Sequence, residues 1–326
     1  MSLRVGIVGT GYVAKARAEI FRGDPRTELV AIAGSPERVT PLAQEWGIAG
    51  YFYWSELVVS NELDVVVVAN VNREHASVVR QALKAGKQVI VDYPLAFDYQ
   101  EAVELWALAD RQELVLHTEQ IEILTGVHQQ ARAWLTEIGD PCLLKYSTTN
   151  PQRPAPQKWT YQPSQFGFPL LASVSRLHRL IDLAGTVEEV FCQLQYRGDD
   201  LPYSFHTCMC QALLRFSSGA IAEVGYHKGE QVWQSERVLE VQGTRGGIFF
   251  RSEQGKLVTP TGEETFTAPP PKGLFRQDTE QFLAHLLDQQ PIYTDRHKVL
   301  HAIATANACE KSVQEHRPVR VQEITG

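Results

Sequence analysis

Short apolar runs alternate with longer mixed segments over the first hundred or so residues of the chain. Each run is long enough for a buried strand and too short for a helix. Residues 65–69 include four successive valines, the β-branched density of a parallel strand that is buried on both faces. The predicted strands are residues 3–8, 29–33, 65–69, 88–91 and 114–117, and the predicted helices are residues 14–21, 39–46, 76–85 and 101–111. This alternation predicts a doubly wound α/β domain with a parallel sheet.

The second half of the chain has a different pattern, in which strand-like segments follow one another through hairpin turns. The predicted strands are residues 143–149, 187–196, 206–216, 220–226, 238–241 and 247–251, with turns at residues 217–219 and 244–246. Predicted helices cover residues 170–183 and a last segment that begins at Thr294 or Asp295 and ends before Pro318. We therefore expect an α+β domain with a large, mostly antiparallel sheet, and two domains that cover residues 1–120 and 121–326.

A glycine motif lies between the first predicted strand and the first predicted helix. Gly9 permits a tight turn, and Gly11 lets the backbone approach a pyrophosphate without a Cβ in the way. The small Ala14 lets the helix pack closely on the strand, so that its N-terminal N–H groups point at the phosphates. A plain glycine turn could have the same spacing, but its position between a strand and a helix predicts a dinucleotide-binding Rossmann domain. The predicted cofactor residues in this loop are Gly9, Thr10, Gly11, Tyr12, Val13 and Ala14.

The end of the second predicted strand indicates which nicotinamide cofactor is used. An NAD site usually has Asp or Glu there to bind the ribose 2′-hydroxyl, and this chain has Gly34 and Ser35 instead. We expect a helix with Ser35 as its N-cap and Pro36 as its first residue. Arg38 then lies in the first turn, where the helix dipole disfavours a cation. A positive charge at this position is explained if Arg38 binds the 2′-phosphate of NADP(H). The alternative is a surface arginine paired with Glu37. We predict NADP(H), with Gly34, Ser35 and Arg38 in its site.

Composition narrows the function classes further. The 326-residue chain has a net charge of −7, which argues against nucleic acid as a partner. None of its apolar runs approaches the length of a membrane span, and no leader-like segment precedes the first predicted strand. The five cysteines and ten histidines show no metal-ligand spacing. We therefore expect no bound metal, no membrane association and reduced thiols in a cytoplasmic protein.

Polar residues follow the third and fourth predicted strands, whose carboxyl ends open onto the crevice where ligands bind in such sheets. The predicted cofactor residues there are Asn70, Val71, Asn72, His75, Asp92 and Tyr93. Together with residues 9–14, residues 85–87 and Pro94, they resemble the glucose–fructose oxidoreductase and inositol dehydrogenase superfamily. The resemblance covers both predicted domains and implies an NAD(P)-dependent oxidoreductase.

The chain departs from most sugar-oxidising members of that superfamily at the residues that do chemistry. Those members carry Glu-Lys-Pro where this chain has Asp92, Tyr93 and Pro94. They also carry an Asp…His pair on a helix of the second domain, where this chain has Ser175 and Arg179. The lysine and histidine that remove a hydroxyl proton from a sugar are therefore missing, which argues against a sugar dehydrogenase.

Within the superfamily, six stretches spread along the chain are similar to the bacterial biliverdin reductases. They are residues 4–22, 92–96, 117–128, 159–170, 175–182 and 273–280. This narrower resemblance implies hydride transfer from NADPH to the central methine carbon of biliverdin, a linear tetrapyrrole, with a proton added at a pyrrole nitrogen to give bilirubin. Two other functions stay open: an NAD(P)-dependent dehydrogenase of a sugar or polyol, and a non-catalytic NADP(H)-binding regulator.

The implied substrate is a flat dianion, which needs apolar or aromatic walls and cationic anchors such as arginine. The apolar stripe of the predicted helix is Leu170, Val174, Leu177 and Ile181. This stripe puts Arg176 and Arg179 together on the opposite face of the helix. Both arginines are therefore predicted to be catalytic and to bind substrate. The alternative is a solvent-facing pair in which Arg179 is bridged to Asp182. Arg176 does not readily lose its proton and would polarise the pyrrole system or an ordered water, or bind a propionate. Tyr93, the third predicted catalytic residue, would donate a proton or stack beside the nicotinamide.

Four further residues are predicted to contact the substrate. Glu119 and Glu122 follow the last strand of the first domain, and they would relay protons or form a salt bridge at the domain junction. Phe166 and Phe168 would line the pigment site or belong to the core. The oligomeric state stays open, and a dimer through the exposed face of the second sheet is one possibility.

Overall fold

The computed structural model describes residues 2–200 and 202–326, so Met1, with which the first predicted domain begins, lies outside the described residues. The chain forms two compact units. The first contains the described residues up to Glu119 together with Gly273–Asp295, and the second contains Gln120–Lys272 and Arg296–Gly326. The sequence prediction assigned residues 273–295 to the second domain. The structure corrects this, because the helix of that segment packs its apolar side chains into the core of the first unit.

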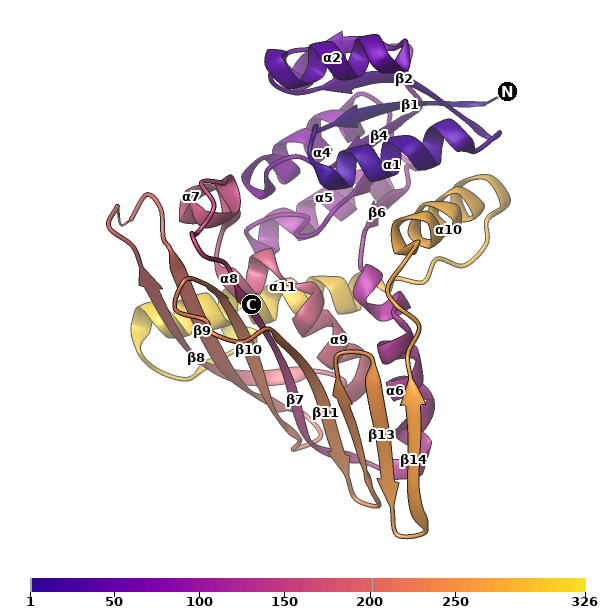
Figure 1. The fold of residues 1–326 in the computed structure, drawn as a ribbon. Helices are drawn as coiled ribbons and strands as arrows, with labels where there is room; N and C mark the ends of the chain where they lie inside the picture. Colours follow the sequence, from indigo (N-terminus) through magenta and orange to yellow (C-terminus); the bar gives the residue numbers. More distant parts are fainter. Residues whose placement is uncertain (1, 201) are drawn as a thin grey trace. The chain divides into compact units, whose positions relative to one another are not determined.

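The first unit contains a six-stranded sheet, counted over the described residues, with the strand order β3-β2-β1-β4-β5-β6. Figure 1 labels four of these strands, β1, β2, β4 and β6. Its strands are β1 (Leu3–Val8), β2 (Thr27–Ala33), β3 (Ala49–Tyr51), β4 (Val65–Val68), β5 (Gln88–Val91) and β6 (Leu116–Thr118). All neighbouring pairs are parallel, which confirms the predicted doubly wound Rossmann sheet. The prediction missed β3, a short strand at the edge of the sheet.

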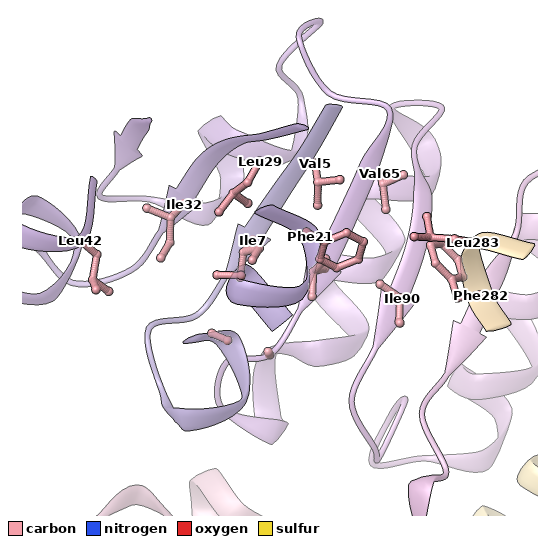
Figure 2. Close-up of a cluster of buried hydrophobic side chains, with 14 of the residues drawn as sticks. Val5, Ile7, Phe21, Leu29, Ile32, Leu42, Val65, Ile90, Phe282 and Leu283 are labelled. Atoms are coloured by element: carbon pink, nitrogen blue, oxygen red, sulfur yellow. The ribbon is translucent and has the colours of Figure 1, made fainter. Parts of the chain in front are cut away.

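Helices cover this sheet, and all of them except α10 (Leu274–Asp288) connect its strands. The connecting helices are α1 (Tyr12–Gly23), α2 (Pro36–Trp46), α3 (Trp54–Val58), α4 (His75–Lys84) and α5 (Tyr99–Arg111), with a 3-10 turn η1 (Asn72–Glu74). Helix α1 packs against α10, and α4 packs against α5. Figure 2 shows how Phe21 of α1 and Phe282 and Leu283 of α10 join Val5 and Ile90 of the strands in one buried cluster. This apolar contact holds α10 on the first unit although it comes late in the chain.

The second unit contains a nine-stranded sheet over its described residues, in the order β14-β13-β12-β11-β7-β10-β9-β8-β15. Its strands are β7 (Pro141–Pro151), β8 (Val187–Arg197), β9 (Thr207–Phe216), β10 (Ile221–Gly229), β11 (Glu236–Gly243), β12 (Gly247–Arg251), β13 (Gln254–Thr259), β14 (Gly262–Thr267) and β15 (Val319–Arg320). The pair β7–β10 is parallel and the other pairs are antiparallel, which confirms the predicted large, mostly antiparallel sheet. The prediction missed β13, β14 and β15.

Helices α6, α9 and α11 lie against this sheet. The helical segments of the unit are η2 (Ile121–Leu124), α6 (Gly126–Ile138), η3 (Trp159–Tyr161), α7 (Pro163–Phe166), α8 (Pro169–Ala172), α9 (Ser175–Ala184), α11 (Arg296–Glu315) and α12 (Gln322–Thr325). The single helix predicted for residues 170–183 is wrong, because Ser173 leaves helical geometry (φ −124°, ψ 36°) and its hydroxyl bonds to the Pro169 carbonyl. Helix α9 is buried almost all round, and its less buried residues are Arg176, Asp182 and Ala184. The predicted division into one apolar and one open face is therefore also wrong.

Candidate active site

The glycine loop after β1 has the geometry that a bound pyrophosphate requires. Gly9 has φ +127°, and a Cβ there would lie 2.2 Å from the Ala69 carbonyl oxygen, so only glycine fits. A Cβ on Gly11 would meet no atom within 4 Å, so the space in front of it is open. Gly11 caps α1, whose first turn has no acidic side chain and no side-chain cap, which leaves its N–H groups for an anion. These residues fit a dinucleotide.

The other predicted residues of the loop have distinct surroundings. Ala14 is fully buried against the sheet, as predicted, and Val13 is half-buried. Tyr12 is 80% exposed, and its ring lies edge-on to that of Phe275. The side-chain methyl of Thr10 faces Gly34, where a Cβ would approach it to 2.7 Å. Gly34 is therefore fixed by close packing of the two loops.

The residues at the end of β2 lie as predicted along the chain. Ser35 is the N-cap of α2, Pro36 begins the helix and Arg38 is exposed in its first turn. The Ser35 hydroxyl bonds to the Glu37 carboxylate and caps no backbone N–H. Arg38 forms no ion pair within the part of the chain that the structure describes, so the alternative pairing with Glu37 does not form. Its guanidinium is available to an anionic ligand.

The turn after β4 is linked to the turn after β5 by His75. The buried imidazole has Nδ1 at 2.8 Å from the Pro94 carbonyl oxygen and Nε2 at 3.4 Å from that of Asn70. Burial lowers the pKa of His75, so the ring is neutral at pH 7. Asn70 donates to Glu74, Asn72 is buried and Val71 is half-buried. A neutral imidazole has one N–H, so His75 donates to one of these two carbonyls and contacts the other, and its ring lies between the two turns.

Asp92, a predicted cofactor residue, is held by an arginine that the sequence analysis did not single out. Arg17 is 0% exposed, and its Nη2 lies 3.0 Å from Asp92 Oδ1 and 2.8 Å from Asp278 Oδ2. Its Nη1 donates to the Thr279 hydroxyl. Burial opposes the charge, but the carboxylates of Asp278 and Asp92 outweigh it and raise the pKa of Arg17. The turn that carries Asp92 and the half-buried Tyr93 is thus tied to α1.

Asp278, on α10, completes this buried network. Its Oδ1 lies 2.7 Å from His117 Nε2 and accepts a hydrogen bond of 2.6 Å from the Tyr293 hydroxyl. Burial opposes ionisation, but Arg17 and His117 outweigh it and lower the pKa of Asp278. Glu119 is buried and adds to the negative charge around Arg17. The two predicted glutamates therefore lie in different units, because Glu122 belongs to the second.

Arg179 lies in a closed ion pair in the second unit. It is 1% exposed, with Nη2 at 2.9 Å from Glu122 Oε2, and it donates to the Glu122 carbonyl and the Thr125 hydroxyl. Burial opposes ionisation, but the charges of Arg179, Arg237 and Arg176 outweigh it and lower the pKa of Glu122. The predicted alternative, a solvent-facing Arg179 bridged to Asp182, is wrong, because Asp182 pairs with His128 and Lys298.

Arg176 has different surroundings from Arg179. It is half-buried, its Nε donates to the Thr148 hydroxyl at 3.1 Å, and its guanidinium lies 5.0 Å from the centre of the Tyr226 ring. Among the described residues, no carboxylate lies within 4 Å of it. Arg179 lies 4.8 Å from the ring of Tyr146, which is two residues from Thr148 on β7. Both arginines therefore lie over the same face of the second sheet.

The predicted aromatic residues are buried in the second unit. Phe166 has its ring centre 6.1 Å from that of Tyr226 and 6.2 Å from that of Trp159. Phe168 is buried where α8 begins. Across residues 2–200 and 202–326, no group of three potential metal ligands occurs and no helix is long and apolar enough to cross a bilayer.

Comparisons with known proteins agree with this geometry. A crystal structure of biliverdin reductase in complex with biliverdin and NADP+ from Synechocystis sp. PCC 6803 is 42% identical, covers 96% of this chain and 99% of its own, and superposes with a TM-score of 0.93. Biliverdin reductase A of Mus musculus is 27% identical over 256 residues, 77% of each chain. Myo-inositol 2-dehydrogenase of Thermotoga maritima is 22% identical over 347 residues, 99% of this chain and 100% of its own.

Family models match both units. Residues 3–120 match the oxidoreductase family with an NAD-binding Rossmann fold, and residues 135–321 match the C-terminal alpha/beta domain of the same family. The second match alone covers more than half of the chain. The family assignment agrees with the parallel sheet, the glycine loop and the mixed second sheet described above. The chain therefore belongs to the GFO/IDH/MocA family of oxidoreductases.

Proposed function

We propose that this protein is an NADPH-dependent biliverdin reductase that converts biliverdin to bilirubin. The observation that carries the proposal is the 42% identity, over 96% of this chain, to a biliverdin reductase whose crystal structure contains biliverdin and NADP+. The reaction adds a hydride to the central methine carbon of the tetrapyrrole and a proton to a pyrrole nitrogen. Because the hydride brings both electrons, the residues of the site have only one proton to deliver.

The residues at the place of the sugar-oxidising pair support this direction of reaction. Ser175 is fully buried, and the guanidinium of Arg179 is paired with Glu122. Neither side chain is suited to accept a hydroxyl proton, since the Ser175 hydroxyl has no hydrogen-bond partner among the described residues and a guanidinium has no acceptor atom. An alcohol dehydrogenase would need such a base.

The first unit is proposed to hold NADPH, which supplies the hydride when bound. The glycine loop would bind the pyrophosphate through the N–H groups of α1. Arg38, which forms no ion pair within 4 Å among the described residues although its charge helps to lower the pKa of Glu37, would bind the 2′-phosphate. The remaining proposed cofactor residues are Thr10, Tyr12, Val13, Ala14, Gly34, Ser35, Asn70, Val71, Asn72, Asp92 and Tyr93, with His75 in a positioning role.

In the second unit, Arg176 is proposed to be the residue that acts on the substrate. It is half-buried, and the hydrogen bond of its side chain within the described residues goes to a neutral hydroxyl, so a lactam oxygen, a carboxylate or an ordered water can be bound. Arg179 is proposed to position Glu122 and the start of α6 through its bonds to Glu122 and Thr125. Phe166 would form part of the aromatic wall, with Phe168 behind it in the core. Tyr93 stays the candidate proton donor.

We also propose a cytoplasmic location. All five cysteines of the chain are free thiols, and four of them are buried. Free thiols persist where glutathione and thioredoxin keep the compartment reducing. The proposed partner is accordingly a small-molecule tetrapyrrole, and no macromolecular partner is needed for the reaction.

A mixing assay tests the proposed function. Purified protein, NADPH and biliverdin should lose the long-wavelength green absorbance of biliverdin and gain the yellow absorbance of bilirubin, with one NADPH oxidised for each pigment molecule. Myo-inositol with NADP+ should give no NADPH, since the sugar-oxidising pair is missing. Binding of NADPH without any change of the pigment would overturn the proposal in favour of a regulator, and oxidation of the polyol would overturn it in favour of a dehydrogenase.

A further inference from the structure

Lys228 lies on the same face of the second sheet as the contacts of Arg176. In the parallel pair β7–β10, Tyr226 is opposite Thr148 and Lys228 is opposite Asn150. Side chains two residues apart on a strand share a face, so Tyr226 and Lys228 both point to the side where Arg176 bonds Thr148. The centre of the Tyr226 ring lies 5.0 Å from the Arg176 guanidinium and 5.6 Å from the Lys228 ammonium.

The ammonium of Lys228 is enclosed by aromatic rings. The residue is 5% exposed, and its Nζ donates to the Thr160 carbonyl. The ring centres within reach are those of Phe166 at 4.1 Å, Tyr161 at 4.4 Å, Phe205 at 5.2 Å and Tyr226 at 5.6 Å. No carboxylate in the described part of the chain lies within 4 Å of it. An ammonium has three N–H donors, and one hydrogen-bond acceptor contacts this one.

Arg176 and Lys228 lie on one face with no carboxylate of the described residues within 4 Å, although the more distant Glu122 interacts with the charge of Arg176, and this is an unfavourable arrangement in the free protein. Burial of a charge costs free energy unless an opposite charge or several hydrogen bonds offset it, and aromatic faces offset only part of it. Burial lowers the pKa of Lys228 to about 7, and the nearby charge of Arg176 acts in the same direction. Arg179 on the same helix, in contrast, is already neutralised by Glu122. An anion bound between Arg176 and Lys228 would remove this cost.

We propose that Arg176 and Lys228 form a carboxylate-binding site for a flat, conjugated dianion, and that Lys228, rather than Arg179, is the second cationic anchor. The inference rests on the proposed function, which makes the ligand biliverdin and the carboxylates its two propionates. Arginine binds a carboxylate through paired N–H groups and lysine as a point charge. The rings of Phe166 and Tyr226 next to them supply aromatic surface for the pyrroles.

An equilibrium titration tests the site without relying on turnover. NADP+-loaded protein is titrated with biliverdin and with biliverdin dimethyl ester, which has the same ring system and no propionate charge, and binding is followed by the pigment absorbance. Lys228→Met should weaken biliverdin binding by about 10- to 100-fold, as for loss of one charged hydrogen bond, and leave ester binding within about twofold of wild type. Lys145→Met, which removes an exposed lysine from β7, is the matched control and should bind both pigments as wild type does.

The outcomes separate this inference from the proposed function. If Lys228→Met binds biliverdin as tightly as wild type, or weakens both pigments equally, the carboxylate site is overturned even if the wild-type protein makes bilirubin. Suppose that wild type binds biliverdin more tightly than the dimethyl ester and that Lys228→Met loses this preference, but that wild type makes no bilirubin with NADPH. The carboxylate site then stands and the reductase function fails. If wild type binds neither pigment, both fail. Lys228→Gln serves as a second variant, and a melting temperature within a few degrees of wild type shows that either variant is folded.

Discussion

Buried cations occur in both units of the molecule, and their partners differ. In the first unit, Arg17 is fully buried and lies within 3.0 Å of carboxylate oxygens of both Asp92 and Asp278. In the second unit, Lys228 is 5% exposed and contacts four aromatic rings and one backbone carbonyl. No carboxylate of the described residues lies within 4 Å of Lys228 or of its neighbour Arg176.

The difference separates a structural role from a binding role. A buried cation surrounded by carboxylates is already neutralised, so it can hold elements together but has little affinity for a further anion. A buried cation without a carboxylate destabilises the free protein, and natural proteins retain such groups where function requires them. Arg17 therefore joins α1, α10 and the Asp92 turn, while Arg176 and Lys228 are the candidates for substrate contact.

The largest effect is expected on removal of Arg17. Arg17→Met would leave the carboxylates of Asp92 and Asp278 buried without their counter-charge, at a cost of about 3–5 kcal/mol in the free energy of unfolding. Urea denaturation followed by circular dichroism measures it. Arg22→Met, an exposed arginine on the same helix, should change stability by less than about 0.5 kcal/mol. Equal stabilities of the two variants would contradict the structural role of the network.

The next effect concerns turnover. Arg176→Ala should lower kcat for bilirubin formation by about 100-fold, the usual cost of removing one preorganised donor to developing charge. NADPH affinity, measured by fluorescence titration, should stay unchanged, since Arg176 belongs to the second unit. Arg197→Ala, an exposed arginine at the end of β8, should behave as wild type. Unchanged turnover of Arg176→Ala would remove this residue from the mechanism.

A smaller effect is expected at the cofactor. Arg38→Ser should raise the KM for NADPH by about tenfold, the loss of one charge-assisted contact, and leave the KM for NADH unchanged. The two cofactors differ only at the 2′-phosphate, so NADH is the internal control. Equal changes for both cofactors would show that Arg38 does not bind the 2′-phosphate.

The smallest effect is on the pH dependence of stability. The pKa of Lys228 is lowered by burial from 10.5 to about 7, so between these values the unfolded chain binds more protons than the folded one. The free energy of unfolding therefore rises with pH between about pH 7 and pH 10.5. Below about pH 7 the buried charge of Lys228 destabilises the folded protein to its full extent. Burial raises the pKa values of its neighbours Tyr161 and Cys208 to about 12, so these two groups do not titrate in this window.

This linkage gives a calorimetric prediction. Lys228→Met should melt a few degrees higher than wild type near pH 7, because it removes the buried charge. The difference should shrink as the pH rises toward 10, where wild-type Lys228 is neutral in the folded state. A variant that melts lower than wild type at every pH would show that the ammonium of Lys228 stabilises its aromatic surroundings. That result would contradict a destabilising effect of the buried charge.

Strong local signals made most of the fold predictable from the sequence. The four-valine run, the glycine loop and the alternating strands of the second half all predicted elements that the structure contains. The missed strands β3, β13 and β14 are short or polar, and they lie at or near sheet edges, where few of their side chains are buried. The break at Ser173 had no signal, because serine is compatible with a helix and tertiary packing decides the geometry there.

The residues of the candidate site were harder to predict, because partners come from distant segments. Arg17 lies on the buried stripe of α1 with Ala14, Ala18 and Phe21, and a charged residue at such a position indicates a buried partner without naming Asp278. Lys228 continues the inward alternation of β10, but the predicted strand ended at residue 226. Whether Arg179 pairs with Glu122 or with Asp182 depends on tertiary contacts that spacing along the chain does not determine.

Transfer of the hydride itself tests the central claim most directly. The protein is incubated with biliverdin and NADPH that carries deuterium at both positions of nicotinamide C4, and the pigment product is analysed by mass spectrometry and proton NMR. We predict bilirubin with one deuterium at the central methine carbon and a slower hydride-transfer step than with unlabelled NADPH. Bilirubin without deuterium at that carbon, or no conversion of biliverdin at all, would contradict the account.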